Sequence, residues 1–105
     1  MTQLKLSPYT QQRRIADRFA AFHAENPAVY DELVALARRA ADRGHKRMGI
    51  DMLFNVIRWN RMLATTDDGT GFKLNDHYRS HYSRLIMQQE PDLAGMFETR
   101  KLTAP

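Results

Sequence analysis

The chain has 105 residues, of which 43% are hydrophobic and 27% charged, a composition that predicts one folded domain with its own core. It contains no cysteine, so disulfides, cysteine-type zinc sites and thiol nucleophiles are excluded. No apolar run reaches the length of a membrane span, and residues 1–10 lack the apolar stretch of a secretory signal. We therefore expect a cytosolic protein.

The net charge of +4 is concentrated in the N-terminal half. Residues 1–49 hold nine Lys and Arg against five Asp and Glu, which leaves +4, whereas residues 50–105 hold seven of each, which leaves zero. A basic half suits an anionic partner such as nucleic acid. Solubility alone is the competing explanation for so modest a surplus.

Two helices are predicted in the N-terminal half, after a tail or extended arm over residues 1–10. The first spans about 11–25, where apolar side chains recur at helical spacing: Ile15, Phe19 and Phe22. The second follows Asn26-Pro27, since Asn26 can cap free amides and proline fits the first helical position. Gly44 should end it, because glycine accepts the left-handed conformation found there.

A third helix, predicted over about 49–63, is apolar on almost every side. Only Asp51, Asn55 and Arg58 form a clear polar line. A helix of this kind is typically the buried centre of its domain. Homodimerisation is a further possibility, either through this helix, which would explain its composition, or through the C-terminal Leu93-Met96-Phe97 segment.

The region after the third helix contains a strong turn signal, Asp68-Gly69. It predicts either a short hairpin with strands near 62–65 and 72–74 or a plain loop. Asn75 should then cap a fourth helix that runs to about Gln89, before Pro91 breaks it. A last short helix from Asp92 would carry three apolar side chains: Leu93, Met96 and Phe97.

The fold class predicted from these elements is all-α or mainly α. We expect a single domain over residues 11–105, built as a compact bundle of four to five helices with at most one short hairpin near 62–74. The order of helices and hairpin resembles that of a winged helix-turn-helix. No internal repeat or second domain is evident.

The predicted fourth helix has the densest group of functional side chains in the chain. Its periodicity places Tyr78, Tyr82 and Leu85 toward the core, with an outward stripe formed by three other residues: His77, His81 and Arg84. The two histidines are spaced to share a metal ion, and His23, Asp76 or Glu90 would have to complete the site. No third ligand has a recognisable spacing, so we expect neither a metal nor another cofactor.

Catalysis has little support in the sequence. No paired carboxylates, glycine-rich phosphate loop or nucleophile elbow accompanies the histidines. A chemical activity must be argued from a site of this kind. We therefore expect a protein that is not an enzyme.

Nucleic-acid binding is the leading functional hypothesis, through a basic surface in which six residues position phosphates: Arg39, Arg43, Lys46, Arg47, Arg79 and Arg84. The third helix is a poor recognition helix, because its polar face is narrow and Asp51 would repel phosphates. The alternative is a protein-interaction module, either an inhibitor of a host factor or defence protein or an adaptor. That module would act through the helix at 75–89, with His77, His81 and Arg84, and through the C-terminal segment.

The C-terminal half resembles small uncharacterised proteins of bacteriophages and prophages over about residues 44–102. The motifs that carry this resemblance are I-R-W at 57–59, F-K-L-N at 72–75, Y-x-x-x-Y-x-R-L at 78–85, P-D-L at 91–93 and F-E-T-R-K-L at 97–102. It implies a bacteriophage or prophage origin and hence a bacterial cytosol. Small DNA-associated regulators and inhibitors of host factors both occur in that setting, and no site residue is carried over.

Overall fold

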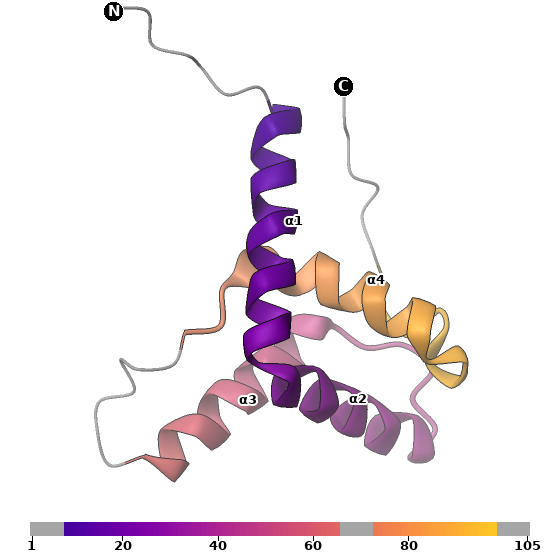
Figure 1. Ribbon diagram of the computed structural model, residues 1–105. Coiled ribbons are helices and arrows are strands. Elements are labelled where there is room, and N and C mark those ends of the chain that lie inside the picture. The colour runs from indigo at the N-terminus through magenta and orange to yellow at the C-terminus, as the bar shows by residue number, and fades with distance from the viewer. Residues whose placement is uncertain (1–7, 66–72, 99–105) are drawn as a thin grey trace, which may run out of the picture.

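The computed structural model describes residues 8–65 and 73–98, which form a mainly helical fold as predicted (Figure 1). Its four α-helices are α1 (Pro8–Glu25), α2 (Pro27–Asp42), α3 (Ile50–Ala64) and α4 (Arg79–Gln89). Two short 3-10 helices flank α4: η1 (Asp76–Tyr78) before it and η2 (Pro91–Leu93) after it. The described residues contain no strand.

Two predicted boundaries were wrong. Helix α1 begins at Pro8, so residues 8–10 belong to the helix and not to the tail. Residues 62–64 form the last turn of α3, which rules out the first strand of the predicted hairpin there. The turn of that hairpin, at residues 66–72, lies outside the described residues, and so does the winged-helix order that depends on it.

The helix ends follow local chemistry, with one exception. Gly44, just after α2, has a φ of 95°. Two of the amides that follow α2 donate to carbonyls of its last turn: Gly44 N–H to Ala41 at 2.9 Å and His45 N–H to Ala40 at 3.1 Å. Asn75 caps as predicted, since its Oδ1 accepts from His77 N–H at 2.9 Å, although the element that it caps is η1. Asn26 does not cap α2. Its side-chain amide instead donates to the Phe22 carbonyl of α1 at 3.0 Å.

The core lies where α2, α3 and α4 meet. Its fully buried side chains come from all three helices: Val29 and Leu33, Phe54 and Ile57, Tyr82 and Ile86. Helix α1 crosses the other helices, and its N-terminal half projects away from them (Figure 1). Phe19 of α1 packs on α4: the centroid of its ring lies 4.7 Å from that of Tyr82, edge-on, and 5.2 Å from that of His81, stacked. Phe22 packs on Tyr78 of η1 with 5.3 Å between the ring centroids. Aromatic residues of η1 and α4 therefore hold α1 in place.

The C-terminal segment closes the core instead of forming the predicted short α-helix. Only Pro91–Leu93 is helical, as the 3-10 turn η2, and Leu93, Met96 and Phe97 are all buried. Met48 N–H donates to the Met96 carbonyl at 3.0 Å, which ties this segment to the chain just before α3. These three apolar side chains are thus used inside the domain, and the segment presents none of them to a partner.

Helix α3 is not buried on every side, contrary to the prediction from its composition. Phe54 and Ile57 are fully covered, but four large apolar side chains are 46–64% exposed: Met52, Trp59, Met62 and Leu63. No other large hydrophobic residue in the described part of the chain is exposed to this degree. The helix therefore has one apolar side in the core and another in solvent.

Candidate functional site

The first candidate surface is the outer face of α3, defined here as Met52, Val56, Trp59 and Leu63, with Met62 beside it. At about 100° per residue, the first four fall within a sector of about 60° on the side of the helix opposite Phe54 and Ile57. Surface helices usually carry polar residues on that side. Exposed apolar patches of this kind mark interaction sites.

Sequence reasoning missed this surface because it read all the apolar residues of α3 as core. The signal was present in the sequence. A helix that faces a core usually carries an apolar stripe of about 100°, whereas the apolar residues of α3 from Trp59 round to Phe54 span about 220° of a helical wheel. Only part of so wide an arc can face the domain's own core.

The charged residues of α3 are occupied within the chain and lie away from the outer face. The Arg58 guanidinium donates to the Leu74 carbonyl and to Asp76, both at 2.6 Å, and Arg61 pairs with Glu32 at 2.8 Å. Asp51 lies 3.7 Å from the Arg79 guanidinium. The outer face is consequently neutral, and a partner gains nothing there from a charge of either sign.

The second candidate surface is the basic end of α2, defined here as Arg39, Arg43, Lys46 and Arg47. All four side chains are exposed, and none has an ion-pair partner among the described residues. The neighbouring Arg38 binds Glu90 at 2.7 Å and Asp92 at 2.9 Å. Arg38 thereby holds the pKa of the Asp92 carboxyl below its ordinary value, chiefly by hydrogen bonding. Both carboxylates are engaged by Arg38, so that the exposed Asp42 offsets only part of the positive charge of the basic end of α2.

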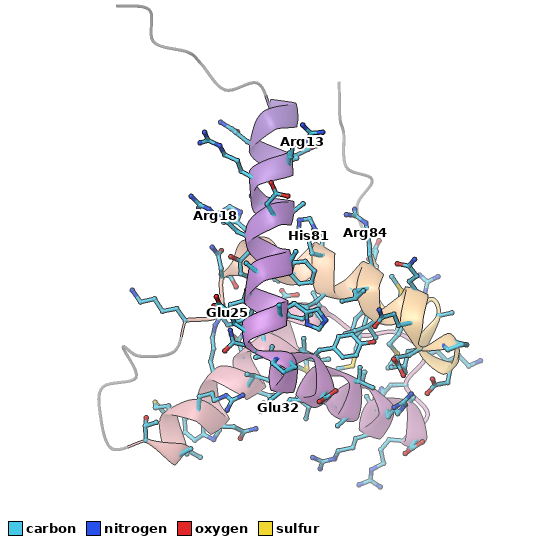
Figure 2. All side chains as sticks on the ribbon, viewed as in Figure 1. Arg13, Arg18, Glu25, Glu32, His81 and Arg84 are labelled. Atoms are coloured by element: carbon cyan, nitrogen blue, oxygen red, sulfur yellow. The ribbon has the colours of Figure 1, made fainter. Side chains whose placement is uncertain are left out.

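The remaining two predicted phosphate contacts lie elsewhere. Arg79, at the start of α4, is held by Asp51 and by the Asp76 carbonyl, to which its Nε donates at 3.1 Å. The basic end of α2 lies near the opposite end of α4, because Arg38 binds Glu90 just after that helix. Arg84 projects from the middle of α4, on the side where His81 meets α1 (Figure 2). The six predicted residues therefore do not form one surface.

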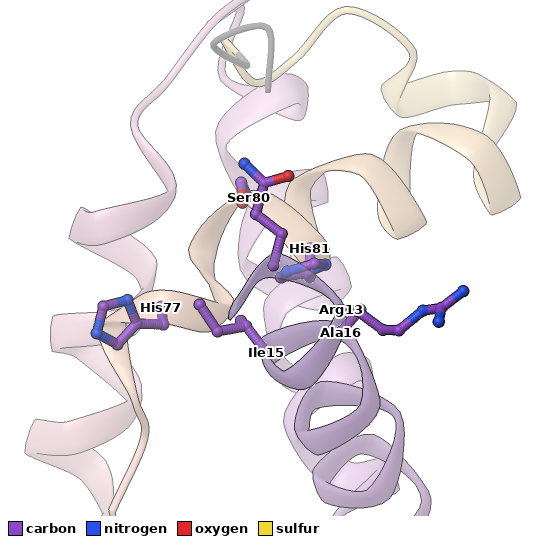
Figure 3. Close-up of a pocket in the computed structure, with 7 residues that line it drawn as sticks. Arg13, Ile15, Ala16, His77, Ser80 and His81 are labelled. Atoms are coloured by element: carbon purple, nitrogen blue, oxygen red, sulfur yellow. The ribbon is translucent and has the colours of Figure 1, made fainter. Parts of the chain in front are cut away.

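The third candidate surface is a groove of about 450 Å³ between α1 and the start of α4. Arg13, Ile15 and Ala16 line it from α1, and His77, Ser80 and His81 from the other side (Figure 3). The His77 ring points away from that of His81 in this view, so the two imidazoles do not converge on one point. The described residues contain no group of three His, Cys, Asp or Glu side chains that could hold a metal ion.

His81 does not lie in an open outward stripe, contrary to its predicted position. Its ring is half-buried against Phe19, because α1 packs over this turn of α4. Burial, and secondarily the positive charge of Arg84, lower the pKa of His81 below its ordinary value. His77 lies in η1 and remains exposed. The three residues predicted to contact a partner thus have different environments.

Acid should weaken the folded state through His81. The unfolded chain takes up a proton on this residue near pH 6.5, whereas the folded chain does so only at lower pH. The protonation of His81 therefore leaves the free energy of unfolding unchanged above that pH and lowers it progressively as the pH falls below it. We expect His81→Phe, which keeps an aromatic ring against Phe19, to lose less stability than the wild type between pH 7.5 and pH 5.

Urea unfolding at a series of pH values measures this effect, and the NMR titration of the His81 ring measures its pKa directly. His45→Gln is the matched control, since His45 is exposed. If the wild type and His81→Phe lost stability in parallel as the pH fell, the assignment of acid sensitivity to His81 would be wrong.

None of the described helices is both long enough and apolar enough to cross a bilayer. Comparison of the chain with protein-family models, with curated proteins and with solved structures finds no match.

Proposed function

We propose that the protein is a non-enzymatic interaction module whose outer α3 face binds a protein partner. The observation that carries the proposal is the exposure of Met52, Trp59 and Leu63 on the side of α3 opposite the core. Trp and Met are enriched at protein interfaces, and a central exposed tryptophan is a common binding hot spot. The apolar side chains of the C-terminal segment are buried, and α1 covers His81, which separates it from His77. We therefore propose a partner surface on α3 in place of the one predicted on α4.

The chemistry of the outer face restricts the partner. Because the face is neutral and Arg58 and Arg61 are bound within the chain, a partner should present a neutral apolar surface, such as one side of a helix. Binding would remove Trp59 from water without stripping water from an ion. On the resemblance alone, we propose a bacteriophage or prophage origin and a bacterial cytosolic setting.

A charge placed in the outer face should abolish partner binding. We expect Met52→Lys together with Leu63→Lys to remove the proteins that the wild-type chain recovers from a bacterial lysate, because each ammonium would be buried without a counter-charge. Ala35→Lys is the control, since Ala35 is exposed on α2. Quantitative mass spectrometry of the recovered proteins provides the measurement. If the same proteins bound all three forms equally, the outer face would not be the binding surface.

Nucleic-acid binding is a second candidate function, supported by the basic end of α2. Its four cations are exposed, and the nearby Glu90 and Asp92 are engaged by Arg38. Such a cluster suits phosphate oxygens, because contacts to phosphates depend on positive charge more than on a shaped binding pocket. Arg79 is bound within the chain, and we propose a footprint that is limited to Arg39, Arg43, Lys46 and Arg47. The affinity of this surface for nucleic acid should fall steeply with salt.

A further inference from the structure

The outer face of α3 has the residue spacing of a helix-pairing seam. Met52, Val56, Trp59 and Leu63 follow at intervals of four, three and four residues, which is the spacing of the a and d positions in paired helices. We propose that a second copy of this chain covers the face, with the two α3 helices antiparallel about a two-fold axis. This inference rests on the proposed function, because it names the partner of the same surface.

The seam is symmetric about its midpoint, between residues 57 and 58. In an antiparallel pair centred there, Met52 lies opposite Leu63 of the partner subunit, and Val56 lies opposite the partner subunit's Trp59. The small side chain of Val56 leaves room for an indole, so each layer is filled evenly. A parallel pair would instead oppose two indoles in one layer and two valines in another. A two-fold interface has to be self-complementary, and this order of residues meets that condition only in the antiparallel arrangement.

The positions beside the seam carry no charge. They are Leu53, Asn55, Asn60 and Met62. In an antiparallel two-fold pair, each flank of the seam meets the same flank of the other copy, so that a charge there would oppose its like. Paired helices usually carry Glu and Lys at these positions. Uncharged flanks remove that repulsion, and a basic chain can therefore pair with itself along α3.

The size and position of the face suit a dimer of moderate affinity. Met52, Trp59 and Leu63 are each more than half exposed, and Met62 nearly so. Together they leave roughly 450 Å² per copy, so that a symmetric pair buries about 900 Å², the size of a weak, reversible interface. Helix α3 extends to the edge of the molecule, away from α4, where a second copy can approach it (Figure 1). We expect dissociation in roughly the micromolar range.

The only tryptophan of the chain lies at the centre of this face and reports on it directly. In sedimentation equilibrium of the full chain, the average mass should rise from one copy toward two with concentration. The emission of Trp59 should shift to shorter wavelength over the same concentrations, because the indole leaves water. Leu63→Lys should weaken the dimer at least tenfold, and Ala35→Lys should leave both curves unchanged.

The absence of cysteine allows the geometry to be tested with single introduced thiols. Val56→Cys should form a disulfide-linked dimer under mild oxidation, because the two copies of this position lie near the axis. Met52→Cys should not, since its two copies are separated by about 16 Å along an antiparallel pair, far beyond disulfide reach. A mixture of Met52→Cys and Leu63→Cys should cross-link, since those positions are opposed.

Three results would overturn the inference: one copy at every concentration, a dimer that Leu63→Lys leaves intact, or self-cross-linking of Met52→Cys. If Trp59 is shielded from water at every concentration while the chain stays monomeric, another part of the same chain covers the face. If the wild-type chain stayed monomeric and recovered lysate proteins that the Met52→Lys, Leu63→Lys variant did not, self-pairing would be refuted and the proposed function supported. A dimer through α3 that recovers no lysate protein would mean that the partner is the chain itself.

Discussion

Replacing Phe54 with alanine is expected to lower the free energy of unfolding by about 3–5 kcal/mol. The side chain is fully buried between α2, α3 and α4, and its ring lies 6.0 Å from that of Tyr82. Truncation would lose the transfer free energy of the ring and leave a cavity among side chains that belong to three helices. For a domain of this size, such a loss is a large part of the total stability. Urea unfolding followed by circular dichroism measures it.

Met52→Ala is the matched control, two residues away on the same helix. Met52 faces solvent, so its truncation should change the free energy of unfolding by no more than about 0.5 kcal/mol. Both variants have to be compared at protein concentrations where the chain is monomeric, because a dimer would add the loss of its own contacts to Met52→Ala. Equal losses in the two variants would show that both sides of α3 are core and that the outer face is covered.

The elements themselves were largely predictable because their signals are local. The apolar spacing of Ile15, Phe19 and Phe22 and the glycine at position 44 depend only on neighbours within one or two turns. Asn26 shows the limit of such reasoning. An asparagine before Pro27 can cap the next helix or return to the previous one, and here its amide donates to Phe22.

The surfaces were predictable only in part because they depend on contacts between distant segments. Periodicity correctly placed Tyr78 and Tyr82 in the core, but it could not show that α1 would cover His81. Glu90 is likewise occupied by Arg38 and Tyr30, which precede it by 52 and 60 residues. In α3, the pattern led us to expect burial on almost every side, and only the packing of α2 and α4 determines which part of its wide apolar arc is core.

Substitutions at the basic end of α2 are expected to have a large effect on nucleic-acid binding. We expect Arg43→Ala, Lys46→Ala and Arg47→Ala together to weaken binding to duplex DNA by more than about tenfold at low salt. The slope of log affinity against log salt should fall by about three, because each lost phosphate contact removes about 0.9 from it. Electrophoretic shift assays over a salt series provide both quantities.

A charge-matched variant separates local contact from net charge. Arg13→Ala, Arg14→Ala and Arg18→Ala remove the same three charges from α1. If the basic end contacts phosphates, this control keeps its salt slope, since long-range attraction alone releases few counterions. Equal salt slopes in the two variants would place the phosphate contacts on both surfaces or on neither. If the wild-type chain shifted no DNA at low salt, nucleic acid would not be a partner.

Pairing through α3 would affect DNA binding as well, because each dimer carries two basic ends. Variants of the outer face that abolish pairing should therefore weaken binding to long duplexes, which can reach both ends, more than binding to short ones.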